Sequence, residues 1–490
     1  MSLRGHPRGL YTLFFTEMWE RFSYYGMRAL LVLYLTAEVF NNGFGFVREH
    51  ALEIYAIFTA LVYLTPIIGG ILADKVLGQR KTIFIGAVTM ALGQFALAAS
   101  VIVAPEIREA TLQFGLALLI LGNGFFKPNI STIVGTLYSD NDPRKDGAFT
   151  IFYMGINLGA FLSPLICGTL GETIGWEYGF ASAGIGMLVG TAWFYFQSNQ
   201  LGHVGFSPKE KDITKLRLVG KDWNEVIAYI IGIIAICYAF VMLWFELSEG
   251  LQSGIIWTLV IGGSLGLITT IFKGTNGSTE WSRVGVILVL AVFHVIFWSG
   301  FEQAGGTFNL FAAENTDRML FGWQIPASYF QSINAIAIFA IAPIFAVMWV
   351  SLDKLGKNPR TPVKFAFGLI MLSLGFFVMA AAKASAGDGT LVSPLWLVSV
   401  YLIHTLGELM LSPIGLSMVT KLSPKKIVSA MMGVWMASIA LGNYLAGVME
   451  AILHSFGMEL YSFIAIEGLV AAGILLLISP ILNKLMKGIH

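Results

Sequence analysis

The chain reads IIGIIAI over residues 230–236 and LVAAGILLLI over residues 469–478. Neither run alternates apolar with polar residues, as the strands of a membrane-spanning barrel would. Of all 490 residues, 56% are apolar and only 12% are charged, whereas about 25% are charged in an ordinary soluble protein. Too few charges remain to cover a water-exposed surface, so the sequence predicts an all-α polytopic membrane protein.

Apolar stretches long enough to cross a bilayer recur along the whole chain. Because a bilayer core requires about 20 apolar residues per helix, we predict fourteen membrane-spanning helices from the sequence. The predicted spans are residues 10–38, 50–73, 82–104, 111–137, 148–170, 178–198, 225–247, 253–272, 284–311, 326–352, 363–384, 394–420, 428–452 and 460–483.

The lysines and arginines are distributed unequally between the two sides of these spans. Twenty-three of the 30 fall in loops on the side of both termini, four fall on the other side and three lie within spans. The positive-inside rule therefore predicts that both termini are cytoplasmic. We expect the chain to lie in the plasma membrane, which in a bacterium is the inner membrane.

Two segments far apart in the chain resemble each other. Residues 121–128 and 406–413 both begin with Leu-Gly and end with Pro at the same spacing. With similar loops around them, they predict two six-helix bundles, 1–200 and 284–490, separated by a cytoplasmic linker and two extra helices in 201–283. Paired bundles with a polar site at their interface are the architecture of an alternating-access transporter.

The first predicted span carries charge on one face. At about 100° per residue, Glu17, Arg21 and Arg28 fall within a sector of about 60°, and Glu20 flanks them. An ionisable group at membrane depth costs at least about 2.5–3.5 kcal/mol, which makes these residues functional candidates. A cluster at a helix end could instead snorkel to the membrane surface, but Arg28 lies too far from either end for that.

The charges within the spans of the two halves have opposite signs. The first half carries the cations Arg21, Arg28 and Lys127. The second half carries the acids Glu302 and Glu408. A cavity between the halves would suit a zwitterion such as a short peptide. A purely structural ion pair of Lys127 with Glu408 is an alternative that the sequence leaves open.

Other polar side chains in the spans suggest proton exchange and substrate contact. Carboxylates beside an arginine can take up and release protons, so Glu17 and Glu20 next to Arg21 predict coupling of transport to protons. Aromatic residues in spans more often serve packing or the membrane interface, and we expect packing or local hydrogen bonds for His294 and His404. The further candidates are Tyr25, Tyr63, Tyr153, Asn157, Trp298, Asn334, Ser412 and Trp435.

The loop after the second span carries a recognisable pattern. Residues 70–81 read GILADKVLGQRK, which resembles the loop motif of the major facilitator superfamily. This resemblance implies the major facilitator fold. It also implies a charge latch, to which Asp74 and Arg80 contribute, between the cytoplasmic ends of neighbouring helices.

Further motifs resemble those of one family within that superfamily, the proton-dependent oligopeptide transporters. They are EMWERFSYYG at 17–26, GFFKPN at 124–129, FYMGINLG at 152–159, FEQ at 301–303 and GELMLSP at 407–413. The resemblance covers nearly the whole chain, and the two extra helices are typical of the bacterial members.

The resemblance implies roles for the residues at matching positions. A basic pocket for the peptide carboxylate would consist of Arg21, Arg28 and Lys127. The peptide amino group would contact Glu408, helped by Asn157 and Asn334, with Ser412 a further substrate-binding candidate nearby in the motif. The side-chain pockets would be shaped by Tyr25, Tyr63, Tyr153, Trp298 and Trp435. The gates between the bundles would be Arg28 with Glu302 towards the outside and Lys127 with Glu408 towards the inside.

Mammalian members carry a histidine where this chain has Ala56, so proton coupling here would rest on Glu17 and Glu20 with Arg21. We expect a proton-coupled symporter that imports di- and tripeptides by alternating access, as a monomer, with no cofactor or metal besides protons. The alternative is another small anion or zwitterion, such as nitrate or an amino acid. We do not expect an enzyme, because no catalytic motif is found in the spans, nor a nucleic-acid partner, because no long basic run is present.

Overall fold

The structure is a computed structural model that describes residues 5–139, 142, 144–207 and 216–488. Part of the predicted cytoplasmic linker, residues 208–215, lies outside the described residues. The described secondary structure is almost entirely helical, and its strands are one short antiparallel pair, β1 (Met319–Leu320) and β2 (Trp323–Gln324). The all-α fold predicted from the sequence is therefore confirmed.

Long apolar helices account for most of the chain. Within the described residues, 12 helical segments are long and apolar enough to cross a membrane. Two further long helices, α1 (Arg8–Thr36) and α9 (Glu249–Gly274), have 29 and 26 residues. At 1.5 Å per residue, each exceeds the roughly 30 Å of a bilayer core. With these two helices, the structure agrees with the fourteen predicted spans.

The chain forms two compact units, which we describe separately. Unit 1 comprises Met1–Val47, Leu61–Glu246 and Pro326–Ile336. Unit 2 comprises Arg48–Ala60, Leu247–Ile325 and Ala337–His490. The predicted division into 1–200, 201–283 and 284–490 stays a prediction, since it follows repeats in the sequence and not compactness in space.

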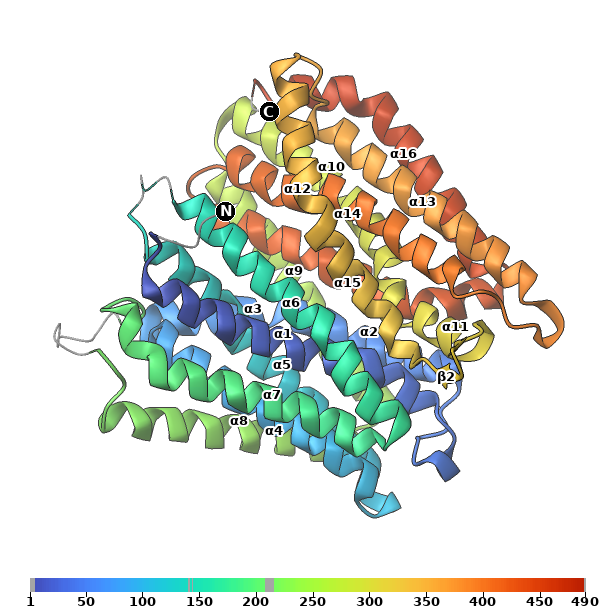
Figure 1. The fold of residues 1–490 in the computed structure, drawn as a ribbon. Coiled ribbons are helices and arrows are strands. Elements are labelled where there is room, and N and C mark those ends of the chain that lie inside the picture. Colours follow the sequence, from blue (N-terminus) through green and yellow to red (C-terminus); the bar gives the residue numbers. More distant parts are fainter. Residues whose placement is uncertain (1–4, 140–141, 143, 208–215, 489–490) are drawn as a thin grey trace. The chain divides into compact units, whose positions relative to one another are not determined.

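Unit 1 is a helical bundle in which α1 packs against α6 and α7, while α4 packs against α5, α7 and α8. Figure 1 shows these helices in blue to green. Small residues allow the close approach of neighbouring backbones, because a Cβ atom on Gly86 would lie 2.6 Å from the carbonyl oxygen of Gly122. Besides α1, the elements of unit 1 are η1 (Val39–Asn41), the end of α2 (Arg48–Leu64), α3 (Pro66–Leu72), η2 (Ala73–Leu77), α4 (Gln79–Ile102), α5 (Pro105–Thr136), α6 (Lys145–Thr173), α7 (Trp176–Gln197), η3 (Ser198–Leu201), α8 (Lys221–Glu246) and η5 (Ala327–Gln331).

The first of the two extra helices, α8, is fixed to unit 1 by charge and by apolar packing. The ammonium of Lys81 lies 2.8 Å from a carboxylate oxygen of Asp222 and also pairs with Glu225. Beside this pair, Trp223 packs edge-on against Phe84 with 4.8 Å between ring centres. The apolar face of α8 continues this contact with α4 and α5 further along the helix. The helix α8 is therefore an integral part of unit 1.

Unit 2 is a second helical bundle, in which α13 packs against α14 and α16 while α10 packs against α15 and α16. These helices are coloured yellow-green to red in Figure 1. Besides the start of α2, α9 and the two strands, the elements of unit 2 are α10 (Gly277–Phe301), η4 (Glu302–Gly305), α11 (Thr307–Asn315), most of α12 (Ser332–Lys354), α13 (Thr361–Ser385), η6 (Gly387–Gly389), α14 (Leu395–Leu422), α15 (Val428–Ser455) and α16 (Leu460–Leu485).

The start of α2 packs tightly against α15 within unit 2. A Cβ atom on Gly447 would lie 2.4 Å from the Cβ of Ala56, which is fully buried. Ala56 stands where mammalian members of the resembling family have a histidine. An imidazole at this position would not fit without displacing α15, so the packing explains why a small residue stands here.

Candidate functional site

The charged face predicted for the first span forms a compact buried cluster. The guanidinium Nε of Arg21 lies 3.1 Å from a carboxylate oxygen of Glu17 and also bonds to Glu20. All three side chains are almost completely buried, with 3% or less of each residue exposed. Burying two carboxylates is tolerable only when cations and hydrogen-bond donors surround them, and Arg21 bonds to both.

Asn123 on α5 completes this arrangement, and the sequence did not reveal it. Its side-chain nitrogen donates to the second oxygen of Glu20 at 3.0 Å, so both oxygens of Glu20 are bonded. One oxygen of Glu17 and one terminal nitrogen of Arg21 are buried without a hydrogen-bond partner. We call Glu17, Glu20, Arg21 and Asn123 the α1 cluster. One feature of the sequence could have indicated Asn123 as a site residue. It lies one helical turn before Lys127, on the same face of α5.

Aromatic rings lie against the cations of unit 1. The guanidinium of Arg28 lies 5.7 Å from the ring centre of Tyr25, and the ammonium of Lys127 lies 4.4 Å from that of Tyr63. Arg21 also lies within 6.0 Å of Tyr25. Cations at these distances are attracted by the negative faces of the rings. The structure thus pairs the predicted site residues Arg21 and Arg28 with Tyr25 on α1, and Lys127 with Tyr63.

The predicted residues of α6 have different environments. The side-chain amide of Asn157 donates to the backbone oxygen of Tyr153 at 2.9 Å, one turn earlier in the same helix. Asn157 is buried, whereas Tyr153 is 44% exposed. The hydrogen bond therefore fixes the orientation of the Asn157 amide along α6, and the substrate contacts of both residues stay predictions.

The acids predicted for the second half are buried in unit 2. Glu302 begins η4 and Glu408 lies in the middle of α14, and 3% and 9% of these residues are exposed. Ser412 lies one turn after Glu408 and is partly exposed. Asn334, in contrast, belongs to the segment of α12 that is part of unit 1. The gate pairs Arg28 with Glu302 and Lys127 with Glu408 each combine residues of different units, and they stay predictions.

Two predicted aromatic residues, Trp298 on α10 and Trp435 on α15, meet at one histidine. The indole nitrogen of Trp298 lies 2.7 Å from Nε2 of His294, and the ring of His294 stacks on Trp435 with 4.0 Å between ring centres. His294 Nδ1 lies 2.7 Å from the hydroxyl oxygen of Ser438. We call Trp298, His294, Ser438 and Trp435 the histidine chain. His404 lies 3.0 Å from the backbone oxygen of Leu372 on α13. Both histidines are buried, as the expected packing requires, but their hydrogen bonds to Ser438 and Leu372 reach other helices and are not local.

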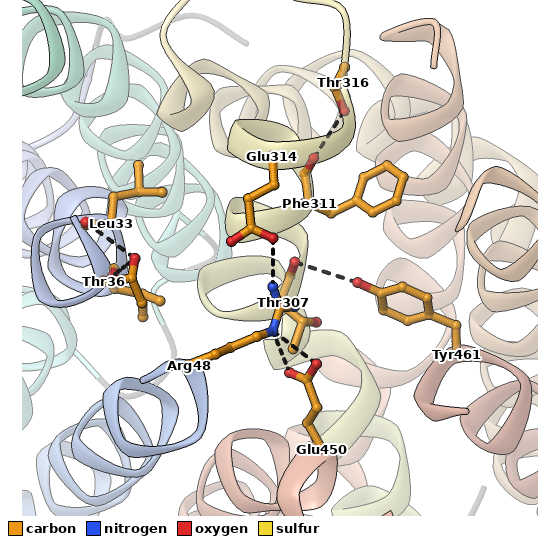
Figure 2. A network of polar contacts seen from close by, with 10 residues as sticks. Leu33, Thr36, Arg48, Thr307, Phe311, Glu314, Thr316, Glu450 and Tyr461 are labelled. Atoms are coloured by element: carbon orange, nitrogen blue, oxygen red, sulfur yellow. Dashed lines mark hydrogen bonds and ion pairs between the residues drawn. The ribbon is translucent and has the colours of Figure 1, made fainter. Parts of the chain in front are cut away.

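A second arginine network lies in unit 2 and was not predicted. Figure 2 shows Arg48, at the start of α2, between two carboxylates from α11 and α15. Arg48 Nε lies 2.9 and 3.0 Å from the two oxygens of Glu450, and its Nη1 lies 3.1 Å from Glu314. Tyr461 lies nearby and donates to the backbone oxygen of Thr307 at 3.5 Å. Arg48 and Glu450 are 402 residues apart, so sequence spacing carries no signal for this contact.

The residues predicted for the loop latch have separate partners in unit 1. Arg80 donates to the backbone oxygens of Gly202, Val204 and Leu216, at 2.6, 2.6 and 2.7 Å. Asp74 is exposed and accepts a hydrogen bond from Gln79 at 3.2 Å. Arg80 therefore holds the segment that follows α7, while the charge latch itself stays a prediction.

Long apolar helices with a charged cluster buried in one unit and two acids buried in the other define a multi-pass membrane transporter. A family model described as "POT family" matches residues 80–464. The chain therefore belongs to the POT family, as its motifs predicted.

Relatives of known sequence resemble the chain over its whole length. The uncharacterized transporter YclF of Bacillus subtilis is 40% identical over 493 residues, which cover 99% of this chain and 96% of that protein. The peptide transporter YePEPT of Yersinia enterocolitica is 38% identical, with coverage of 99% and 96%. A di-/tripeptide transporter of Lactococcus lactis is 35% identical, with coverage of 99% and 98%.

Solved structures show the same fold. A crystal structure of a peptide transporter POT in complex with sulfate has a TM-score of 0.84 and 36% identity, and the match covers 100% of this chain and 97% of that one. A POT family transporter in complex with 5-aminolevulinic acid has a TM-score of 0.83 and 33% identity, with 98% of each chain covered. The predicted major facilitator fold is thereby confirmed.

Proposed function

We propose that the chain is a symporter that imports di- and tripeptides together with protons by alternating access. Two relatives that match over almost their full length carry the names of peptide and di-/tripeptide transporters. The observation within the chain that supports the proposal most strongly is the α1 cluster, where Arg21 bonds to both Glu17 and Glu20. Burying these charges lowers the stability of the fold, so their presence in the membrane indicates a function.

The peptide termini match the buried charges of the two units. In the proposed complex, the carboxylate is bound by the cations Arg21, Arg28 and Lys127, which already attract the electron-rich rings of Tyr25 and Tyr63. The ammonium is bound by Glu408, with Glu302 available to a gate. Charge-assisted hydrogen bonds of this kind are about twice as strong as neutral ones, so binding favours a zwitterion over a neutral solute.

The α1 cluster offers a route from proton binding to peptide binding. Arg21 bonds to Glu17 and Glu20, and one oxygen of Glu17 has no hydrogen-bond partner. A proton bound there neutralises Glu17 and weakens its hold on Arg21, because a neutral acid attracts a guanidinium less. Arg21 then turns to the peptide carboxylate, and the reverse exchange releases the proton. A proton bound at Glu17 would thus favour peptide binding at Arg21, which is the positive coupling that symport requires.

Three further expectations belong to this proposal. We propose a cell-membrane location with both termini cytoplasmic, as the distribution of lysine and arginine predicts. One chain is proposed to suffice for transport, with no metal or organic cofactor. Coupling would rest on carboxylates, in line with the tight packing around Ala56.

Reconstitution in liposomes tests the proposed function. An inward proton gradient is imposed across proteoliposomes and the uptake of labelled dialanine is followed, with an uncoupler and protein-free liposomes as controls. Accumulation above equilibrium that the uncoupler abolishes supports the proposal. If dialanine does not accumulate while nitrate or an amino acid does, the substrate class is wrong. Uptake of dialanine only down its own gradient, whatever the proton gradient, would reject the coupling.

A further inference from the structure

His294 lies at the contact between α10 and α15 and is almost fully buried, with 1% of the residue exposed. Both of its ring nitrogens have partners. Nε2 lies 2.7 Å from the indole nitrogen of Trp298, one helical turn later, and Nδ1 lies 2.7 Å from the hydroxyl oxygen of Ser438. The residue therefore joins two helices through hydrogen bonds as well as through packing.

The chemistry of the indole group determines the direction of every hydrogen bond in this chain. An indole N–H can only donate, so Nε2 of His294 must accept and the ring proton must lie on Nδ1. Nδ1 then donates to the hydroxyl oxygen of Ser438, whose own proton goes to the backbone oxygen of Trp435 at 2.7 Å. Each donor has an acceptor, and the imidazole is neutral.

Packing holds the members of the histidine chain in place. The ring of His294 stacks on Trp435 at an interplanar angle of 22°. Trp435 also lies against Gly415 of α14, where a Cβ atom would be 2.4 Å from the indole ring. A Cβ atom on Gly442 of α15 would lie 2.6 Å from the Cβ of Trp298, so α10 and α15 approach closely at this point. The Trp435 indole thus contacts both His294 and α14, while the hydrogen bond to His294 fixes the Trp298 indole.

The hydrogen bond to His294 occupies the indole N–H, which is the one polar group of the Trp298 side chain, so this group cannot donate to a ligand. An indole has one N–H and no acceptor nitrogen. With the N–H bound to His294, Trp298 can offer a ligand only its aromatic carbon surface. Trp298 keeps 8% of its surface exposed, whereas Trp435 is 1% exposed, so the remaining contact surface belongs to Trp298.

We propose that His294 is a specificity-determining residue, which makes the Trp298 pocket selective for apolar peptide side chains by occupying the indole N–H. This inference rests on the proposed function and on the role that the family resemblance implies for Trp298, that of shaping a pocket for a peptide side chain. Without an acceptor at residue 294, the buried N–H would lack a partner and would favour a polar side chain of the peptide instead. Leaving a buried donor unpaired is costly, whereas a matching acceptor in the ligand removes the penalty.

The test compares two substrates of nearly equal size, Ala-Leu and Ala-Asn, in variants of residue 294. His294→Phe keeps an aromatic ring over Trp435 but lacks the acceptor. His294→Gln can place its carbonyl oxygen near the position of Nε2. For His294→Phe we expect the ratio of the KM values to shift about threefold to tenfold towards Ala-Asn, at similar kcat per folded protein. For His294→Gln we expect a ratio close to that of the wild type.

A merely structural role for His294 predicts a different result. In that case all variants that fold would keep the wild-type KM ratio and would differ only in Tm or in the amount of folded protein. An unchanged ratio in His294→Phe overturns the proposal. Should that variant not fold, His294→Asn replaces it, because asparagine is too short to bring its oxygen to Trp298. Equal KM ratios for the Gln and Asn variants would then overturn the proposal.

Two controls separate this inference from its premises. His404→Gln changes another buried histidine of unit 2, which contacts a backbone oxygen on α13 and no tryptophan indole nitrogen, and its KM ratio should equal that of the wild type. Trp298→Phe removes the N–H itself, so that adding His294→Phe should shift the ratio no further. If the wild-type protein takes up neither peptide, the proposed function fails. If it takes up both and the KM ratio stays fixed, only the role of His294 fails.

Discussion

Unit 1 and unit 2 both bury a group of polar side chains, but the two groups are built from different chemistry. The α1 cluster of unit 1 consists mainly of ionised residues, and three of its buried atoms, one each on Glu17, Arg21 and Asn123, have no hydrogen-bond partner. The histidine chain of unit 2 is neutral, and each donor in it has an acceptor. A group with unused hydrogen-bonding capacity can exchange partners at low cost, whereas a fully bonded group resists change.

This difference suggests a division of tasks between the two groups. Exchange of partners is what coupling to protons requires, and a fixed geometry is what discrimination between substrates requires. Substitutions in the α1 cluster should therefore separate proton-driven uptake from peptide exchange. Substitutions in the histidine chain should alter both processes to the same extent or alter substrate preference alone.

The largest effect is expected for Glu20→Gln. Glutamine is nearly isosteric and can still accept from Asn123, but it is neutral and cannot attract Arg21 as the Glu20 carboxylate does when Glu17 takes up a proton. Proton-driven accumulation of dialanine should be abolished, while exchange of dialanine across proteoliposomes without a gradient should persist. Ser438→Ala, a change in the other polar group, is the control and should affect driven uptake and exchange equally. Driven uptake at the wild-type rate in Glu20→Gln would remove this residue from the coupling mechanism.

A smaller effect is expected for Asn123→Leu. This change removes the donor 3.0 Å from Glu20 and leaves one carboxylate oxygen buried without it, a loss of about 1–3 kcal/mol. Driven uptake should fall about tenfold relative to exchange, since 1.4 kcal/mol corresponds to a factor of ten. The matched control is Asn443→Leu on α15, because Asn443 is also buried and donates to Ile439 of its own helix, its one acceptor among the described residues. Equal effects of the two variants would mean that Asn123 serves packing alone.

Substitutions in the Arg48 network should lower the stability of the fold by an amount between the preceding effects and the next one. Its members are partly exposed, with 27% of the Arg48 side chain, 25% of Glu450 and 51% of Glu314 accessible. Screening by solvent limits the contribution of such pairs, so Arg48→Gln should lower stability by about 1 kcal/mol or less. Thermal unfolding in detergent should rank the losses as Arg48→Gln, then Glu450→Gln, then Glu314→Gln. A loss for Glu314→Gln as large as that for Arg48→Gln would contradict this ranking.

The smallest effect is expected for Asp142→Asn, outside the spans. Hydrogen bonds from Arg144 lower the pKa of the Asp142 carboxyl to about 2, from an ordinary value of about 4. A lowered pKa means that the pair stabilises the fold above about pH 4 and loses this contribution as the pH falls towards 2. Wild type and variant should therefore differ slightly in Tm at pH 7, and the difference should shrink on acidification. A Tm difference that grows as the pH falls would contradict the prediction that the ionised Asp142 stabilises the fold.

The sequence predicted the charged face of α1 because helical periodicity determines which nearby residues of the chain share one face of a helix. Glu17 and Arg21 are one turn apart, and their ion pair follows from that spacing. The buried acids and the number of spans were likewise accessible, since apolar length and embedded charge are local properties of the sequence.

The contacts that the sequence did not reveal depend on how helices pack. Asn123 reaches Glu20 across 103 positions, and no pattern along either helix states that α1 and α5 meet there. The pairing of Arg48 with Glu450 and the hydrogen bonds of Arg80 to backbone oxygens have the same cause. Every residue has a backbone carbonyl oxygen, so the side chains of Gly202, Val204 and Leu216 do not indicate that Arg80 donates to their backbones.

Arg80 also has a consequence for the biogenesis of the protein. During insertion, arginines in short cytoplasmic loops help to orient the neighbouring spans. In the folded chain the guanidinium of Arg80 is buried and its partners are peptide oxygens, which carry no formal charge. One side chain thus serves at two stages, first as a topological signal and later as an anchor for the segment after α7. A lysine there would retain the first contribution, but its ammonium would lack the planar guanidinium that meets several carbonyls at once.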